Sequence, residues 1–238
     1  MRSFTYAVRQ IVPILLAYLF VGLASGLLLH QAGYGVIWAF LSALFIYAGS
    51  MQIVMVTLMT SGASLAVVAV TALFINARHI FYGLSFIDEF RAVGGRRGSR
   101  WKFPYMALTL TDETYSVLCS LRVPEDCDRG KVEFTILFLC HMLWIVSCTL
   151  GAAVGELLPV DMAGIEFSAT ALFTAVVVNQ WREARSHIPA VIGLVSAVLF
   201  YFTLGPDGMI LPALSASVVA LMFFKKKIPA GLPEDCHE

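Results

Sequence analysis

The feature that most constrains the fold of this chain is a series of apolar segments separated by short polar ones. A helix of about 20 apolar residues is long enough to cross the hydrocarbon core of a bilayer. Only 13% of the 238 residues are charged, whereas soluble domains carry about 25%, so these segments are typical of membrane helices. Eight segments have this character, near residues 11–29, 36–60, 64–86, 104–121, 132–155, 163–180, 187–204 and 208–224.

We therefore predict an all-α polytopic membrane protein, a bundle of about 6–8 transmembrane helices in contact with the lipid bilayer. The connecting segments leave no room for a separate soluble domain, so residues 1–238 are expected to form one integral-membrane domain. Basic and acidic residues are balanced, 16 against 16, so the chain has no bulk positive charge that would favour nucleic acid as a partner.

The charges of the loops predict which side of the membrane each loop faces. Cytoplasmic loops carry an excess of Lys and Arg. The loop 87–103, the loop 181–186 and the tail 225–238 are rich in basic residues, whereas the loop 156–162 has acidic residues and no Lys or Arg. We expect the first three on the cytoplasmic side, the fourth outside, and both termini in the cytoplasm. The basic residues of the first loop are Arg91, Arg96, Arg97, Arg100 and Lys102.

Two of the apolar segments are predicted to be broken or re-entrant. If 104–121 crossed the membrane completely, counting back from a cytoplasmic tail would place the most basic loop outside. The conflict disappears if both 36–60 and 104–121 enter the membrane and return. Each has a polar centre, Tyr47-Ala48-Gly49-Ser50-Met51-Gln52 in one and Thr109-Leu110-Thr111-Asp112-Glu113-Thr114 in the other. The alternative is seven or eight simple crossings with one breach of the charge rule.

Broken helices of this kind have a functional meaning. Non-helical backbone at membrane depth is tolerated only where protein or a water-filled cavity satisfies its polar groups. In secondary transporters, discontinuous helices build the substrate site. The predicted breaks therefore mark candidate positions for a hydrated path.

A third polar island, Asn76-Ala77-Arg78-His79, lies within the apolar run 64–86. A helix that starts at Leu65 would rise roughly 16 Å before it reaches Asn76, about halfway through the hydrocarbon layer. Ionic side chains at that depth usually face protein or a water-filled cavity, because exposing them to lipid costs at least about 2.5–3.5 kcal/mol each.

The three islands supply the candidate site. Ser50 and Gln52 can donate and accept hydrogen bonds, which suits a zwitterionic ligand. Arg78 stays protonated and needs an anion, so we expect one carboxylate of the adjacent Asp112 and Glu113 to pair with it and the other to face a cavity. His79 is either a proton relay or a packing residue. The candidate substrate-binding and translocation residues are Ser50, Gln52, Asn76, Arg78, His79, Thr111, Asp112 and Glu113.

Several alternatives stay open at this point. The ionic residues can form a buried pair that only locks helices together, although such pairs are weak evidence for stability. The chain can be an accessory or scaffold subunit without a substrate path of its own. An intramembrane enzyme using His79 with a carboxylate is the weakest alternative, because no nucleophile stands beside a base. We predict no catalytic residue, no metal site and no cofactor, and the sequence has no G-x-x-x-x-G-K-[ST] phosphate loop.

Two further features favour packing. Gly22-Leu23-Ala24-Ser25-Gly26 has the small-residue spacing of a closely packed helix face, which could also serve another subunit. His141 lies in an apolar run between Cys140 and Met142, which is more typical of a packing residue than of a ligand.

The three islands, in this order and spacing, resemble the AzlC family of inner-membrane permeases. The resemblance rests on Tyr47 to Gln52, on Asn76 to His79 followed by Tyr82-Gly83, and on Leu110 to Glu113, and it extends over most of the chain. One difference is that the first helix of the family usually carries a second proline before a Val-Gly pair, where this chain has Phe20.

The resemblance implies a function and a partner. It implies export of branched-chain amino acids such as valine and leucine, or of analogues, by the large subunit of a two-component permease in a bacterial inner membrane. It also implies a small companion membrane subunit of the AzlD type, and it is compatible with a higher oligomer.

Overall fold

The structure of the chain, a computed structural model, confirms the all-α class. It describes residues 2–94, 101–157, 174, 177–178, 181–182 and 186–224, apart from the side chains at 78, 81, 94, 206–208, 210, 211 and 224. Every regular element within these ranges is a helix, and four of the helices are long and apolar enough to cross a membrane. The number of full crossings and the sides that the loops face remain predictions.

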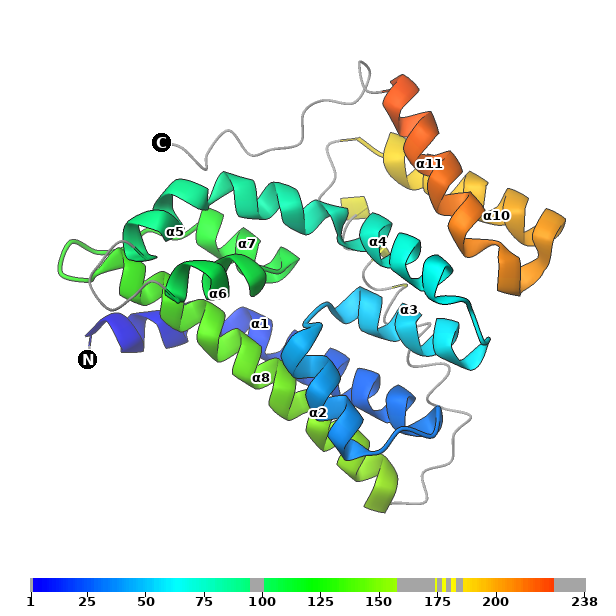
Figure 1. Cartoon of the computed structure of the whole chain (residues 1–238). Coiled ribbons are helices and arrows are strands. Elements are labelled where there is room, and N and C mark those ends of the chain that lie inside the picture. Colours follow the sequence, from blue (N-terminus) through cyan, green and yellow to red (C-terminus); the bar gives the residue numbers. More distant parts are fainter. Residues whose placement is uncertain are drawn as a thin grey trace. The chain divides into compact units, whose positions relative to one another are not determined.

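The described helices are shown in Figure 1. Those long enough to span are α1, α4, α8 and the part of α10 from Ile188 to Gly205. The bounds are α1 Arg2–Gln31, α2 Val36–Phe45, α3 Gly49–Thr60, α4 Leu65–Ser85, α5 Ile87–Gly94, α6 Lys102–Leu108, α7 Asp112–Cys119, α8 Arg129–Leu157, α10 Ile188–Gly208 and α11 Ile210–Phe224.

The chain forms two compact units. The first consists of Met1–Val56 and Asn76–Ile165, and the second of Thr57–Ile75 and Glu166–Glu238. In the second unit α10 packs against α11, and large apolar side chains such as Phe202 and Phe223 are exposed. The prediction that residues 1–238 act as one membrane domain remains a prediction. All the candidate site residues lie in the first unit.

Helix α8 is the centre of the first unit, with contacts to α1, α2, α5, α6 and α7. Its partner along most of its length is α1, and the two helices lie side by side in Figure 1. Small residues allow this close approach: a Cβ atom added at Gly22 would lie 2.5 Å from the Cβ of Ser147, and one at Gly26 would overlap the Cys148 carbonyl oxygen. The small-residue face predicted from the sequence therefore packs within this chain, against α8.

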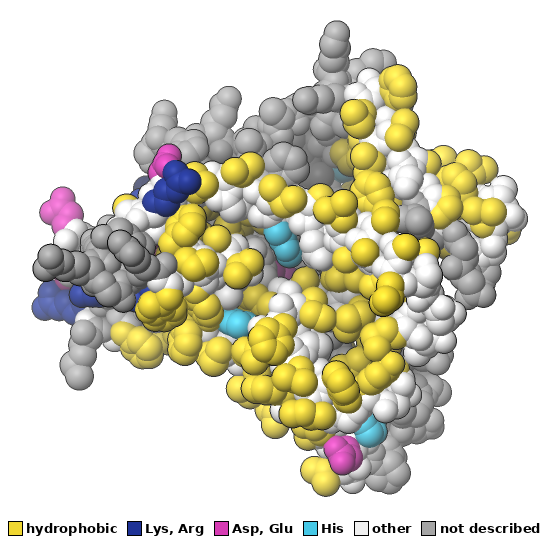
Figure 2. Space-filling model, in the orientation of Figure 1, with side chains coloured by type: hydrophobic (Ala, Val, Ile, Leu, Met, Phe, Trp, Pro, Cys, Tyr) yellow, Lys and Arg dark blue, Asp and Glu magenta, His cyan; other side chains and the backbone are white. Residues whose placement is uncertain are grey.

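Ion pairs attach α5 to the beginning of α8. The Arg129 guanidinium is 2.8 Å from Glu89 on α5 and 2.8 Å from Glu133, one turn later on α8. On the face drawn in Figure 2, most charged side chains of the first unit lie at the end where α5 and the amino end of α1 lie, one acidic side chain lies at the opposite end, and hydrophobic side chains cover most of the surface between them. A protein surrounded by lipid between two aqueous layers is expected to distribute its charges in this way.

Both segments predicted to be broken are broken. Residues 46–48 separate α2 from α3, and Tyr47 there has a φ of 41°, a left-handed conformation that costs roughly 1–2 kcal/mol in a residue other than glycine. Residues 109–111 separate α6 from α7. In contrast, α1 continues through Pro13 as one helix of 30 residues.

Candidate functional site

The candidate site is organised by the amino end of α7, the half-helix that follows the second break. Thr111 is the N-cap, and its hydroxyl accepts the Thr114 backbone N–H while the Thr114 hydroxyl accepts the Thr111 backbone N–H. This reciprocal capping satisfies two donors that a helix start leaves without partners. It also fixes the first turn of α7, which carries Asp112 and Glu113.

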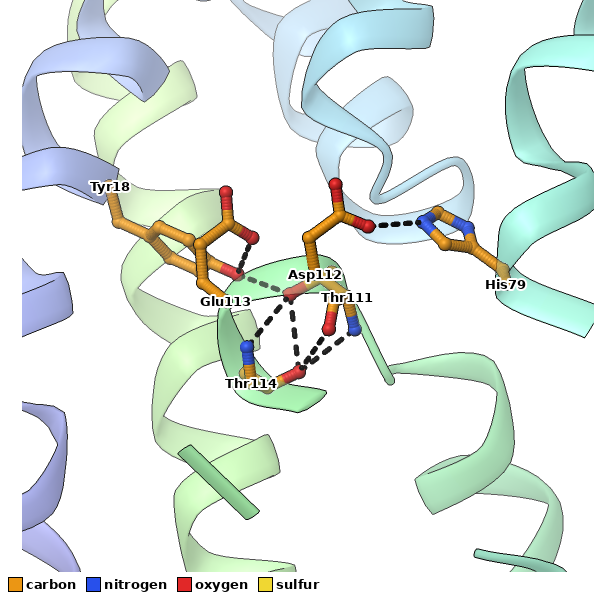
Figure 3. Close-up of polar contacts among 6 residues, drawn as sticks. All are labelled: Tyr18, His79, Thr111, Asp112, Glu113 and Thr114. Atoms are coloured by element: carbon orange, nitrogen blue, oxygen red, sulfur yellow. Dashed lines mark hydrogen bonds and ion pairs between the residues drawn. The ribbon is translucent and has the colours of Figure 1, made fainter. Parts of the chain in front are cut away.

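The two carboxylates of α7 point to different neighbours, as Figure 3 shows. Adjacent residues on a helix project about 100° apart. Asp112 is directed toward α4, and Glu113 is directed toward α1. The sequence predicted that the two side chains diverge, and the structure identifies the partner of each.

Asp112 is paired with His79. The His79 Nε2 lies 3.7 Å from the Asp112 Oδ1, and about a quarter of the histidine side chain and a third of the aspartate side chain are exposed. This links the second and third islands directly. Arg78, the partner expected from the sequence, lies on α4, but its side chain is outside the described residues, so its predicted pairing remains a prediction.

Glu113 is held from the other side by Tyr18 of α1. The buried Tyr18 hydroxyl is 2.6 Å from the Thr111 hydroxyl and donates a hydrogen bond of 3.2 Å to the Glu113 Oε2. The glutamate side chain is otherwise exposed. One tyrosine therefore attaches both the cap and a carboxylate of α7 to α1.

Gln52 lies in a different arrangement, with both ends of its amide in use. It is 2% exposed, and its Oε1 accepts a 2.8 Å hydrogen bond from the Trp144 indole N–H. Its Nε2 donates to the Ser42 hydroxyl at 3.2 Å, and Ser42 donates in turn to the Ala39 carbonyl. This chain of hydrogen bonds joins α3 to α2 and α8 across the first break.

Trp144 and Tyr18 connect the first island to the third. Their rings are 5.4 Å apart in an edge-to-face arrangement. A path of contacts therefore runs from Gln52 through Trp144 and Tyr18 to Thr111. Ser50, another candidate residue, is half-buried in the first turn of α3. Asn76, a candidate residue on α4, has a buried side-chain oxygen without a hydrogen-bond partner in the described structure.

Sequence reasoning missed Tyr18 and Trp144 as members of the site. Both lie in long apolar helices, where an aromatic residue first suggests core packing. The available signal was chemical, because a buried phenol or indole normally finds a hydrogen-bond partner. A tyrosine and a tryptophan at the middle of predicted spans therefore indicate polar groups at the same depth on other helices.

The described side chains give the site a negative bias, with two carboxylates beside one imidazole and a phenol. The carboxylate oxygens are acceptors, and they suit an ammonium ion, which has three donors and no acceptor. Within the described ranges, no three His, Cys, Asp or Glu side chains are grouped closely enough to hold a metal ion. The chemistry of these groups is suited to an organic cation or a zwitterion.

Comparison with known proteins agrees with the resemblance seen in the motifs. A membrane protein of Helicobacter pylori, named only as uncharacterized, is 36% identical over 228 residues, 96% of this chain and 97% of the relative. The branched-chain amino acid transport protein AzlC of Bacillus subtilis is 28% identical over 95% of this chain and 87% of its own length. The inner membrane protein YgaZ of Escherichia coli is 25% identical over 84% of this chain and 82% of its own length.

No solved structure matches the chain. The family described as AzlC protein matches residues 13–158, which include both breaks, the three polar islands and the whole of α8. This match and the relatives that extend over nearly the full length confirm the resemblance, and the chain belongs to the AzlC family.

Proposed function

We propose that this chain is the large subunit of a two-component permease that exports branched-chain amino acids or their analogues. The observation that carries the proposal is the pair of diverging carboxylates at the start of α7, directly after a helix break and in contact with helices that are long and apolar enough to cross a membrane. Membership of the AzlC family supports it, as does a relative named as a branched-chain amino acid transport protein.

In this proposal α7 recognises the ammonium group of the substrate. Asp112 and Glu113 are both partly accessible, and each has a partner that an ammonium ion can replace or share. The carboxylate of the substrate is recognised by Arg78 or by backbone amides at the helix breaks, because an arginine at this depth requires an anion.

Aromatic rings beside the Asp112–His79 pair supply an apolar wall for the substrate side chain. Tyr82 lies 6.0 Å from the His79 ring, and it stacks on Tyr115 at 4.4 Å. A branched aliphatic side chain gains free energy from contact with such rings because apolar surface is removed from water. The wall therefore suits substrates whose side chain is apolar.

The proposal includes a membrane orientation and a partner. Loop charges favour an inner-membrane protein with both termini in the cytoplasm, and one relative is named as an inner membrane protein. A small membrane subunit of the AzlD type would complete the permease.

Efflux of labelled valine or leucine from proteoliposomes tests the site. Losing a hydrogen bond to a charged group costs about 1.5–3 kcal/mol, so we expect Asp112→Asn to reduce efflux by about 10- to 100-fold. Glu113→Gln and Arg78→Ala are measured in parallel. Asp88→Asn is the matched control, because Asp88 is an exposed carboxylate in the first turn of α5.

The result that would contradict the site assignment is unchanged efflux in Asp112→Asn, Glu113→Gln and Arg78→Ala together. Thiol labelling then separates a transporter from a scaffold. Cysteines placed at 50, 76 and 112 should react with aqueous reagents in at least one state if a hydrated path passes them. Inaccessibility at all three positions would favour an accessory subunit.

A further inference from the structure

His141 touches both of the broken segments. It is 4% exposed and lies within the span α8. Its Nδ1 is 3.0 Å from the hydroxyl of Tyr105 on α6, the half-helix that precedes the second break. Its ring lies 4.4 Å from the ring of Tyr47, the residue with left-handed backbone at the first break. His141, which the sequence suggested was a packing residue, therefore connects both helix breaks to α8.

The second ring nitrogen of His141 is not satisfied. Nε2 is buried and has no hydrogen-bond partner in the described structure. The backbone groups of Ala43 and Leu44, in the last turn of α2, interact with the imidazole. The last carbonyls of a helix lack partners within the helix and can accept a hydrogen bond from the ring, but burial disfavours a charged imidazole, so this position suits the neutral ring.

This arrangement makes the ring sensitive to proton binding. When Nδ1 accepts the Tyr105 hydroxyl, the single proton of the neutral ring is on Nε2, facing the end of α2. When the ring binds a second proton, both nitrogens become donors, so the Tyr105 hydroxyl can no longer donate to Nδ1, and a positive charge lies in a buried position. Each protonation state therefore holds α2 and α6 to α8 differently.

We propose that His141 is a proton-binding positioning residue that clasps the carboxyl end of α2 and the half-helix α6 to α8. Proton binding loosens this clasp, because it places a charge on a buried ring and turns Nδ1 from an acceptor into a donor, and proton release restores it. The proposed effect of proton binding on the packing of the first unit does not depend on what the protein transports. An effect on substrate movement rests on the proposed transport function.

The groups around His141 leave it as the titrating member of this cluster. Tyr105 faces it from α6 and Tyr47 from the first break, and Cys140 is its neighbour on α8. Phenols and thiols ordinarily stay neutral near pH 7. Glu113 on α7 acts electrostatically on Tyr47 and Cys140, the neighbours of the ring.

Hydrogen–deuterium exchange of the purified full-length chain in lipid nanodiscs tests the clasp without substrate. Exchange is compared at about pH 5 and about pH 8, on either side of the ordinary histidine pKa of about 6.5, after correction for intrinsic amide rates. In the wild type we expect residues 42–52 and 102–111 to be protected about tenfold more at the higher pH, where the ring is neutral. A tenfold change corresponds to a difference of about one pKa unit between the tight and loose states.

His141→Gln should remove this pH dependence in both segments, whereas the control His187→Gln, at an exposed histidine of the second unit, should retain it. If His141→Gln does not fold, Tyr105→Phe keeps the ring and removes one anchor, and it should abolish the pH effect at 102–111. The proposal is overturned if the wild type shows no pH dependence in these segments, if the dependence persists in the folded His141 or Tyr105 variant, or if His187→Gln removes it. None of these exchange results depends on transport. The proposed transport function is tested separately by the efflux measurements, so a failure of one proposal is distinguishable from a failure of the other.

Discussion

Buried aromatic residues with a polar atom determine how the first unit is joined. Trp144 uses its indole N–H to hold Gln52, and its ring supports Tyr18. Gly49, at the start of α3, allows the close contact, since an added Cβ would lie 3.0 Å from the Trp144 ring. These residues place the first break against α8 and, through Tyr18, against α7.

The hydrogen bond between Trp144 and Gln52 predicts a measurable coupling. Trp144→Phe keeps an aromatic ring but leaves the buried Gln52 oxygen without its donor, and an unsatisfied buried polar group costs about 1–3 kcal/mol. We expect this variant and Gln52→Leu each to lower the unfolding midpoint in detergent. In a double-mutant cycle the two effects should not add, because either change alone breaks the same bond.

Trp38→Phe is the control for this pair, because Trp38 is 56% exposed and should tolerate the substitution. Fully additive effects of Trp144→Phe and Gln52→Leu would show that the indole and the amide do not support each other.

At the scale of the helices, α1 and α8 form the frame on which the half-helices are arranged. Their contact depends on backbone approach at glycines, as is common between membrane helices, where lipid offers no hydrophobic driving force. Tyr18 and Trp144 lie on the facing surfaces of this pair. The separation of α1 and α8 therefore controls the distance between the two halves of the candidate site.

Gly26→Ala should separate α1 from α8, because the new methyl group would overlap the Cys148 carbonyl. Overpacking of a close interface typically costs about 1–3 kcal/mol, so we expect a lower unfolding midpoint and weaker efflux. Gly83→Ala is the matched control, since Gly83 lies in α4 with open space around it and alanine favours a helix. Equal stability of the two variants would be inconsistent with direct backbone contact between α1 and α8.

At the scale of the whole molecule, the loop charges predict an orientation that reporter fusions can measure. Fusions ending near Gly98, Glu183 and the carboxyl terminus should place an active fluorescent protein in the cytoplasm. A fusion near Pro159 should instead give active alkaline phosphatase outside. The reason is that basic loops are retained on the cytoplasmic side during insertion.

The fusion near Gly98 decides between the two predicted topologies. A cytoplasmic reporter there supports segments 36–60 and 104–121 that do not cross completely. An external reporter at the same position would favour seven or eight simple crossings and would place the most basic loop against the charge rule.

Local sequence properties were sufficient to determine the class of this protein and the positions of its irregularities. Hydropathy predicted membrane helices. The polar centres near Gly49 and Thr111 predicted both breaks, because a polar group that lacks a hydrogen-bond partner is costly in lipid and irregular backbone occurs where protein or water supplies one. The three islands also carried the family motifs. The angle between adjacent helical residues correctly indicated that Asp112 and Glu113 would diverge.

Only the tertiary structure decided the partners. Asp112 is beside His79, Glu113 is beside Tyr18, and Gln52 is bonded to Trp144, a residue 92 positions away in sequence. Hydropathy and spacing report which face of a helix is apolar, but they do not report which helix lies opposite. That choice depends on how closely α1 and α8 can approach, and the backbone contacts at Gly22, Gly26 and Gly151 set this approach in three dimensions.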